Sequence, residues 1–170
     1  MSNNNNRQLG KAPWLHVIIS TGFGIGFTPV APGTAAALLA LGLWWIGFSF
    51  LSVHTLFWVT LITTIVVTLI GVWTSNVMER YWGEDPRAVV IDEFIGVWIP
   101  ALVAPCGEHT LLLAWLGFAA FRIIDMTKIL GCRWVETNKK INGGWRVMLD
   151  DALAGFYALI IVAITKYFIL

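Results

Sequence analysis

Long apolar segments separated by short polar ones run through most of this chain. A helix that crosses a bilayer needs about 20 mostly apolar residues. Five segments approach or reach that length, and they cover residues 35–51, 55–73, 88–104, 111–128 and 151–170. The pattern therefore predicts an all-α, polytopic integral membrane bundle of about five transmembrane helices.

The segment before the first predicted span has a different character. Residues 14–27 are apolar but contain three glycines, and two prolines follow at Pro29 and Pro32. Glycine and proline interrupt regular helix, so an interfacial or re-entrant segment is favoured over a sixth span. We expect a polar N-terminal tail at residues 1–11 and a single membrane-embedded domain at residues 12–170.

Composition supports a membrane protein. The chain is 58% hydrophobic and 12% charged, and no Asp, Glu, Lys or Arg occurs from residue 12 to residue 78. A soluble domain of average composition is about 25% charged, so this chain lacks the residues for a polar shell. The net charge of +1 argues against a nucleic-acid partner. The sequence indicates no protein partner.

Positive charge alternates between the connecting segments. Lys and Arg occur before the first predicted span, after the second and after the fourth, and they are missing from the loops at residues 52–54 and 105–110. Cytoplasmic loops of membrane proteins carry the excess of Lys and Arg. The alternation predicts a multi-pass membrane protein with a cytoplasmic N-terminus.

Five acidic side chains lie at the edges of predicted spans, all on the expected cytoplasmic side: Asp92, Glu93, Asp125, Asp150 and Asp151. A charged side chain at such a position costs free energy, so a functional role is the first hypothesis for it. Clustered carboxylates repel one another, and Mg²⁺ prefers oxygen ligands. We expect these five residues to bind metal and to be catalytic. The alternative is that Asp92, Asp150 and Asp151 are acids at helix starts, where the helix dipole favours them.

Two cations accompany the acids. Arg122 and Asp125 are three residues apart and share a helix face, which Lys128 continues. Arg122 and Lys128 are candidates for binding substrate phosphate. The alternatives are an intrahelical ion pair for Arg122 and a membrane anchor for Lys128.

The glycine-rich segment is a weaker candidate for phosphate binding. Backbone amides at a helix start attract anions, which makes Gly24, Gly33 and Thr34 candidates, with Thr34 also a possible helix cap. Close helix packing is an equally good explanation for the glycines. Cys132 lacks the surrounding signature of a phosphate-attacking thiolate.

Four runs of sequence carry a resemblance to a known family: GFGIGFTPVAPGT, VVIDEFIGVW, FRIIDMTK and GGWRVMLDDALAG. They resemble, in order and spacing, the motifs of phosphatidylglycerophosphatase A. The resemblance implies a bacterial inner-membrane, Mg²⁺-dependent lipid phosphatase that converts phosphatidylglycerophosphate to phosphatidylglycerol, a step toward cardiolipin.

The resemblance also implies residue roles. The family's Asp-Glu pair falls on Asp92 and Glu93, its Arg-x-x-Asp on Arg122 and Asp125, and its paired aspartates on Asp150 and Asp151. Lys128, Glu136, Gly33 and Thr34 match further motif positions.

The chain departs from the family pattern at three positions. Ile129 and Gly131 stand where relatives tend to have proline, and Arg146 stands where they tend to have glycine. These departures leave every carboxylate in place and bear on loop shape and head-group selection.

Two other functions are compatible with membrane carboxylates. A cation transporter or channel would prefer acids near the bilayer midplane and often shows an inverted repeat, whereas these acids cluster at one edge and no repeat is visible. A phosphotransferase that joins a nucleotide-activated lipid to an alcohol would carry an Asp-Gly-x-x-Ala-Arg signature, which is missing here.

Overall fold

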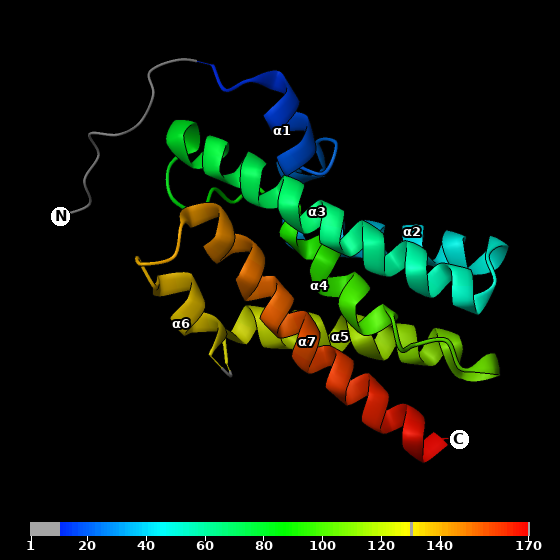
Figure 1. The fold of residues 1–170 in the computed structure, drawn as a ribbon. Helices are drawn as coiled ribbons and strands as arrows, with labels where there is room; N and C mark the ends of the chain where they lie inside the picture. Colours follow the sequence, from blue (N-terminus) through cyan, green and yellow to red (C-terminus); the bar gives the residue numbers. More distant parts are fainter. Residues whose placement is uncertain (1–10, 130, 170) are drawn as a thin grey trace.

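A computed structural model describes residues 11–129 and 131–169, so nearly all of the predicted N-terminal tail lies outside the described residues. These residues form helices and no strand, which confirms the predicted all-α class. The four longest helices are α2 (Pro32–Phe50), α3 (Val53–Trp82), α5 (Thr110–Thr127) and α7 (Gly143–Ile169), and they run lengthwise through the bundle (Figure 1).

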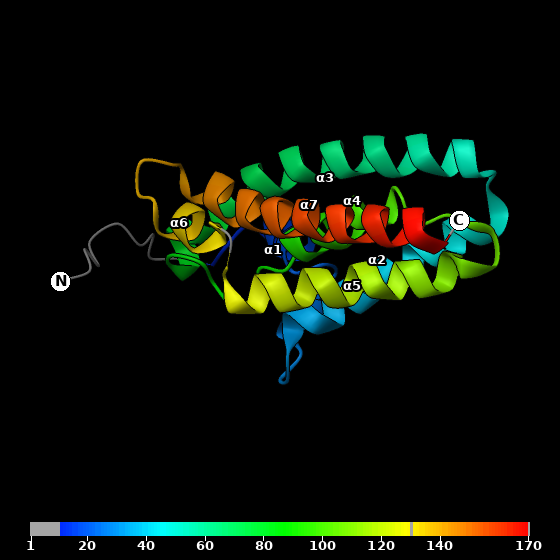
Figure 2. The same ribbon diagram turned by 90° about the horizontal axis from the view of Figure 1, so that it is seen from below.

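These four helices are the ones in the described part of the chain that are long and apolar enough to cross a membrane. The predicted span at 88–104 is instead the shorter α4 (Asp92–Ala101), whose 10 residues rise about 15 Å. That is about half of a hydrocarbon core. α4 lies inside the bundle (Figure 2), where it contacts α2, α3, α5 and α7. The apolar segment at 88–104 is therefore a core helix that carries Asp92 and Glu93 at its first turn.

Small residues allow the helices around α4 to approach closely. A Cβ on Gly96 of α4 would overlap the Phe121 ring of α5, and a Cβ on Gly155 of α7 would lie 2.8 Å from the Gly96 carbonyl oxygen. A Cβ on Gly117 of α5 would lie 3.0 Å from Pro100 Cβ. Close backbone approach through small residues is the usual packing mode of membrane helices.

The outward face of α3 remains apolar. Trp58, Ile62, Ile65 and Leu69 are all exposed, and their spacing puts them on one helical stripe. A contiguous apolar surface of this kind indicates contact with lipid rather than water. The protein is a membrane protein, as the sequence predicts.

The N-terminal segment is not a span. It forms the short helices α1 (Trp14–Ser20) and η2 (Ile25–Phe27), and α1 packs against α3. The predicted Thr34 cap is wrong, because α2 begins earlier, at Pro32, and its N-cap residue is Ala31. Proline is favoured at the first helical position because the N–H it lacks would have no helical partner there.

The charged connections lie at one end of the bundle. The end of α3, the short helix α6 (Cys132–Thr137) and the start of α7 meet there, while the α2–α3 connection and the C-terminal end of α7 lie at the opposite end (Figures 1 and 2). The short helix η3 (Gly107–His109) precedes α5 at that opposite end.

Candidate active site

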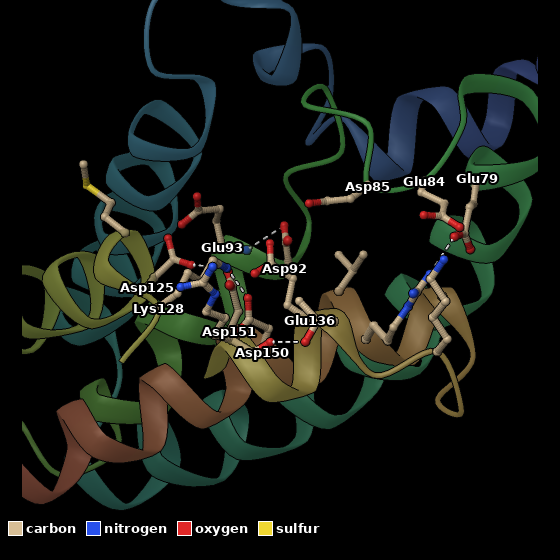
Figure 3. A pocket seen from close by; sticks show the side chains of 17 residues that line it. Glu79, Glu84, Asp85, Asp92, Glu93, Asp125, Lys128, Glu136, Asp150 and Asp151 are labelled. Carbon is tan, nitrogen blue, oxygen red and sulfur yellow. Dashed lines mark hydrogen bonds and ion pairs between the residues drawn. The ribbon is translucent and has the colours of Figure 1, made fainter. Parts of the chain in front are cut away.

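A cavity of about 690 Å³ opens at the charged end of the bundle. It is lined from α3, the α3–α4 connection, α4, α5, α6 and α7 (Figure 3). The lining is rich in charge, and its ionic side chains are Glu79, Glu84, Asp85, Asp92, Glu93, Asp125, Lys128, Arg133, Glu136, Lys139, Arg146, Asp150 and Asp151. Carboxylates outnumber cations, so the cavity attracts positive charge.

All five predicted carboxylates line this cavity. Asp125, Asp150 and Asp151 come closest together, with one oxygen from each within 4.8 Å of the others. Asp92 and Glu93 approach the same cavity from the start of α4 (Figure 3). Three helices that are distant in sequence therefore deliver these acids to one place.

The structure separates the acids by their relation to helix starts. Asp92 and Glu93 occupy the first turn of α4, where the helix dipole stabilises negative charge. α7 begins at Gly143 and has no acid in its first turn. Since the dipole effect fades within one turn, it does not account for Asp150 and Asp151, which are 4% and 3% exposed.

Both aspartates of α7 have an oxygen with no partner. Asp150 Oδ1 and Asp151 Oδ2 are buried and accept no hydrogen bond from the described residues. A buried unpartnered polar atom is costly, and more so when charged. These oxygens are therefore available to a cation in the cavity.

Lys128 lies between two of the clustered acids. Its Nζ is 3.0 Å from Asp125 Oδ1 and also contacts Asp150. Lys128 ends α5 in the left-handed conformation, at φ 50°, and this turns the chain away at the helix end. Burial by itself would lower the pKa of Lys128, but its hydrogen bond to Asp150 and the nearby carboxylates raise the pKa above its usual range. The ammonium thus stays charged at the cavity.

Arg122 is bound to carboxylates behind the cavity. It contacts Glu93, lies 2.9 Å from Asp125 Oδ2 and reaches Thr34 Oγ1 at 3.4 Å. Arg122 does not appear among the residues that line the cavity. The intrahelical pair with Asp125, which was the alternative to phosphate binding by Arg122, is present, and the added contacts join α2, α4 and α5.

The glycine-rich segment contributes little to the cavity. Gly24 does not line it, and the Gly24 N–H donates to Thr21 Oγ1 at 3.1 Å within its own turn. Gly33 lies directly against the Glu93 carboxylate, so a larger residue would displace that side chain. Gly33 and Thr34 thus pack behind Glu93 and Arg122, where close approach is the structural reason for glycine.

Sequence reasoning did not assign Glu79 to the site, and it linked Arg146 only to loop shape and head-group selection. They form an ion pair between α3 and α7, 2.9 Å from Arg146 Nη2 to Glu79 Oε1, and both line the cavity. Glu84 and Asp85 join the lining from the α3–α4 connection. One signal was available, since all four lie next to the predicted cytoplasmic ends of spans.

Cys132 is unsuited to nucleophilic attack. Burial, together with the charge of Asp150, raises the pKa of its thiol to about 11. The thiolate is the reactive form of cysteine. The thiol is therefore inert near neutral pH, in agreement with the missing sequence signature.

Comparison with known proteins adds to this geometry. The sequence profile described as phosphatidylglycerophosphatase A matches residues 18–166. The chain belongs to the phosphatidylglycerophosphatase A family. The resemblance inferred from the four motifs is thereby confirmed, and so is the assignment as a phosphatase.

Three relatives illustrate the range of the family. A Bacteroides thetaiotaomicron protein with the provisional name phosphatidylinositol-3-phosphatase is 45% identical over 92% of this chain and 96% of its own. Phosphatidylglycerophosphatase A of Escherichia coli is 35% identical over 84% of this chain and 77% of its own. That of Haemophilus influenzae is 33% identical over 90% of each chain. No solved structure matches.

Proposed function

We propose that this phosphatase removes the terminal phosphate of a membrane phospholipid with the help of Mg²⁺ bound in the acidic cavity. The observation that carries the proposal is the set of three carboxylate oxygens within 4.8 Å of one another at the end of a membrane bundle. A transporter would place its acids nearer the bilayer midplane. These acids instead lie toward one end of α5 and α7, where lipid head groups are found.

The residues fit Mg²⁺. Asp125, Asp150 and Asp151 offer only oxygen atoms as metal ligands. Two of these oxygens, Asp150 Oδ1 and Asp151 Oδ2, accept no hydrogen bond from the described residues. Mg²⁺ is usually bound in proteins by one or two carboxylates together with water and substrate phosphate, and this cluster supplies at least that number. When bound, the ion neutralises phosphate charge and favours ionisation of a water molecule.

The remaining charged groups have complementary roles in this proposal. Lys128 faces the cavity and can donate to a phosphate oxygen. Arg122 binds Glu93 and Asp125 from behind, so it positions these carboxylates. Asp92 lines the cavity without a cation partner among the described residues, which leaves its carboxylate able to accept a proton from the attacking water.

Two substrates follow from the comparisons. The family description and two relatives support phosphatidylglycerophosphate, which would yield phosphatidylglycerol. The relative that is 45% identical supports phosphatidylinositol 3-phosphate as a second candidate. Both are phospholipids with a phosphomonoester on a head-group alcohol, so one cavity chemistry serves either.

The proposal also includes an orientation. The cavity lies at the end where the Arg- and Lys-containing connections of α3–α4 and α5–α7 gather (Figure 1). Because positive loops remain in the cytoplasm, we place the cavity and the N-terminus on the cytoplasmic side of the bacterial inner membrane. Product phosphate would then be released into the cytoplasm.

The test is phosphate release by the purified protein in detergent micelles. We expect turnover of one or both lipids with Mg²⁺, loss of turnover with EDTA, and recovery when Mg²⁺ is added back. The Asp150→Asn variant serves as the inactive control. Mg²⁺ flux into liposomes without phosphate release from either lipid would support the transporter alternative and end this proposal.

A further inference from the structure

The Glu79–Arg146 ion pair occupies a part of the cavity that the reaction described above does not use. The two side chains are 25% and 15% exposed, and they connect the last turns of α3 to the first turn of α7. Figure 3 shows Glu79 beside Glu84, set apart from the group formed by Asp125, Lys128 and Asp150.

Two glycines allow this pair to form. The Glu79 carboxylate lies directly against Gly143, where any Cβ would collide with it. A Cβ on Gly144 would lie 2.2 Å from the Val72 carbonyl oxygen of α3, and the Gly144 N–H donates to Asn76 Oδ1 at 2.8 Å. The glycines at the start of α7 thus let α3 and α7 pack tightly and fix the position of Arg146 relative to Glu79.

Arg146 is also placed to reach a molecule held at the acids. It precedes Asp150 by four residues on α7, so the two share a helix face and are separated by about 6 Å along the axis. Both line the same cavity. Among the described residues Arg146 donates one side-chain hydrogen bond, to Glu79. A guanidinium has five N–H donors, so most of its donors remain for a ligand.

The surroundings favour hydroxyl groups over a second phosphate. Glu79 and Glu84 lie side by side in this part of the cavity and make it acidic, which disfavours an anion and favours groups that donate to carboxylates. Arg146 also lies nearer than Asp150 to the start of α7, which is at the charged end of the bundle. The phosphodiester of a substrate is tied to acyl chains in the bilayer, whereas the head-group hydroxyls are on the same polyol as the terminal phosphate, and therefore lie beside the acids that would bind that phosphate.

We propose that the Glu79–Arg146 pair binds the hydroxyl groups of the lipid head group whose phosphate lies at Asp125, Asp150 and Asp151. The carboxylate accepts from a hydroxyl and the guanidinium donates to one, so the pair selects lipids with a polyol head group. This inference rests on the proposed phosphatase function, and it assigns selectivity to residues outside the acidic cluster.

The experiment compares Arg146→Lys and Glu79→Gln with the wild-type protein. Arg146→Lys keeps a charge partner for Glu79 but loses the planar fork of donors. Phosphatidylglycerophosphate and phosphatidylinositol 3-phosphate carry head-group hydroxyls, and phosphatidic acid carries none. We expect KM for the lipids with hydroxyls to rise about tenfold in each variant, the effect of one lost charged hydrogen bond. We expect kcat to change little, and phosphatidic acid, as substrate or competitive inhibitor, to behave as with the wild type.

Arg80→Gln is the matched control, because Arg80 is the exposed neighbour of Glu79 on α3 and does not line the cavity. It should leave all three lipids unaffected. Equal losses of activity on all three lipids, together with a lower melting temperature, would assign the pair a purely structural role and overturn the inference. Unchanged KM values in both variants would overturn it as well. If the wild-type protein releases no phosphate from any lipid, the proposed function itself fails.

Discussion

Asp151→Asn should make this protein nearly inactive and, under metal-free conditions, more stable. Asp151 is 3% exposed, and its Oδ2 has no hydrogen-bond partner. Asparagine keeps the size of the side chain and removes a negative charge from a cavity that Asp125 and Asp150 already make negative. The substitution therefore relieves repulsion in the chelated protein while removing a proposed metal ligand.

The magnitude follows from the burial. A buried charge costs several kcal/mol, and the buried amide that replaces it still costs about 1–3 kcal/mol, so the gain is the difference between the two. We expect the variant to gain about 1–3 kcal/mol in EDTA, and each kcal/mol raises the melting temperature of a chain this size by about 2–4 °C. With Mg²⁺ at 100 times its Kd the wild-type protein gains about 2.7 kcal/mol. The variant should gain less, so the difference in melting temperature narrows or reverses.

Tryptophan fluorescence of the detergent-solubilised protein, which contains 10 tryptophans, follows unfolding in EDTA and in Mg²⁺. Phosphate release measures activity. Loss of a residue that only supports a metal ligand costs up to about 100-fold in activity. Asp151 is itself a proposed ligand, so we expect activity to fall at least about 100-fold. The control is Glu108→Gln, whose side chain is 87% exposed at the opposite end of the bundle. An Asp151→Asn protein that melts below the wild type in EDTA, or that retains wild-type turnover, refutes the reasoning.

Three further predictions concern residues around the cavity. Arg122→Gln should lower the free energy of unfolding by about 3–5 kcal/mol, because it leaves the nearly buried Glu93 carboxylate without its cation and removes one of the two cations that contact Asp125; denaturation in urea and detergent measures this. Gly96→Ala should cost about 1–3 kcal/mol through overlap with the Phe121 ring, measured by the melting temperature. Cys132→Ser should retain turnover, and the Cys132 thiol should resist maleimide at pH 7, because its raised pKa of about 11 keeps it protonated.

Each of these predictions has its own opposing outcome. A wild-type unfolding free energy for Arg122→Gln would show that Arg122 does not hold the acids in place. Gly96→Ala should be compared with Gly42→Ala, since nothing lies within 4 Å of a Cβ at Gly42; equal melting temperatures would contradict the packing argument. Loss of turnover in Cys132→Ser, or rapid maleimide labelling at pH 7 that disappears in this variant, would contradict an inert thiol.

The sequence by itself determined the class of the protein and most of the acidic site. Runs of apolar residues specify membrane helices because hydrocarbon requires both apolar side chains and internally bonded backbone. The loop charges indicated which span ends lie together. Because span length and direction set the depth of each residue, the sequence alone placed Asp92, Asp125 and Asp150 at one end of the bundle.

The tertiary structure decided what could not follow from local pattern. The apolar segment at 88–104 had the composition of a span, but packing on all sides by other helices made α4 a 10-residue core helix. The pairing of Arg122 with Glu93 and that of Arg146 with Glu79 depend on which helix faces pack together. The first pair is 29 positions apart in the sequence and the second is 67 positions apart. A hydropathy pattern depends on residues that are close together in the sequence. Ion pairs and cavities form between helices that are distant in the sequence, so only the folded arrangement specifies them.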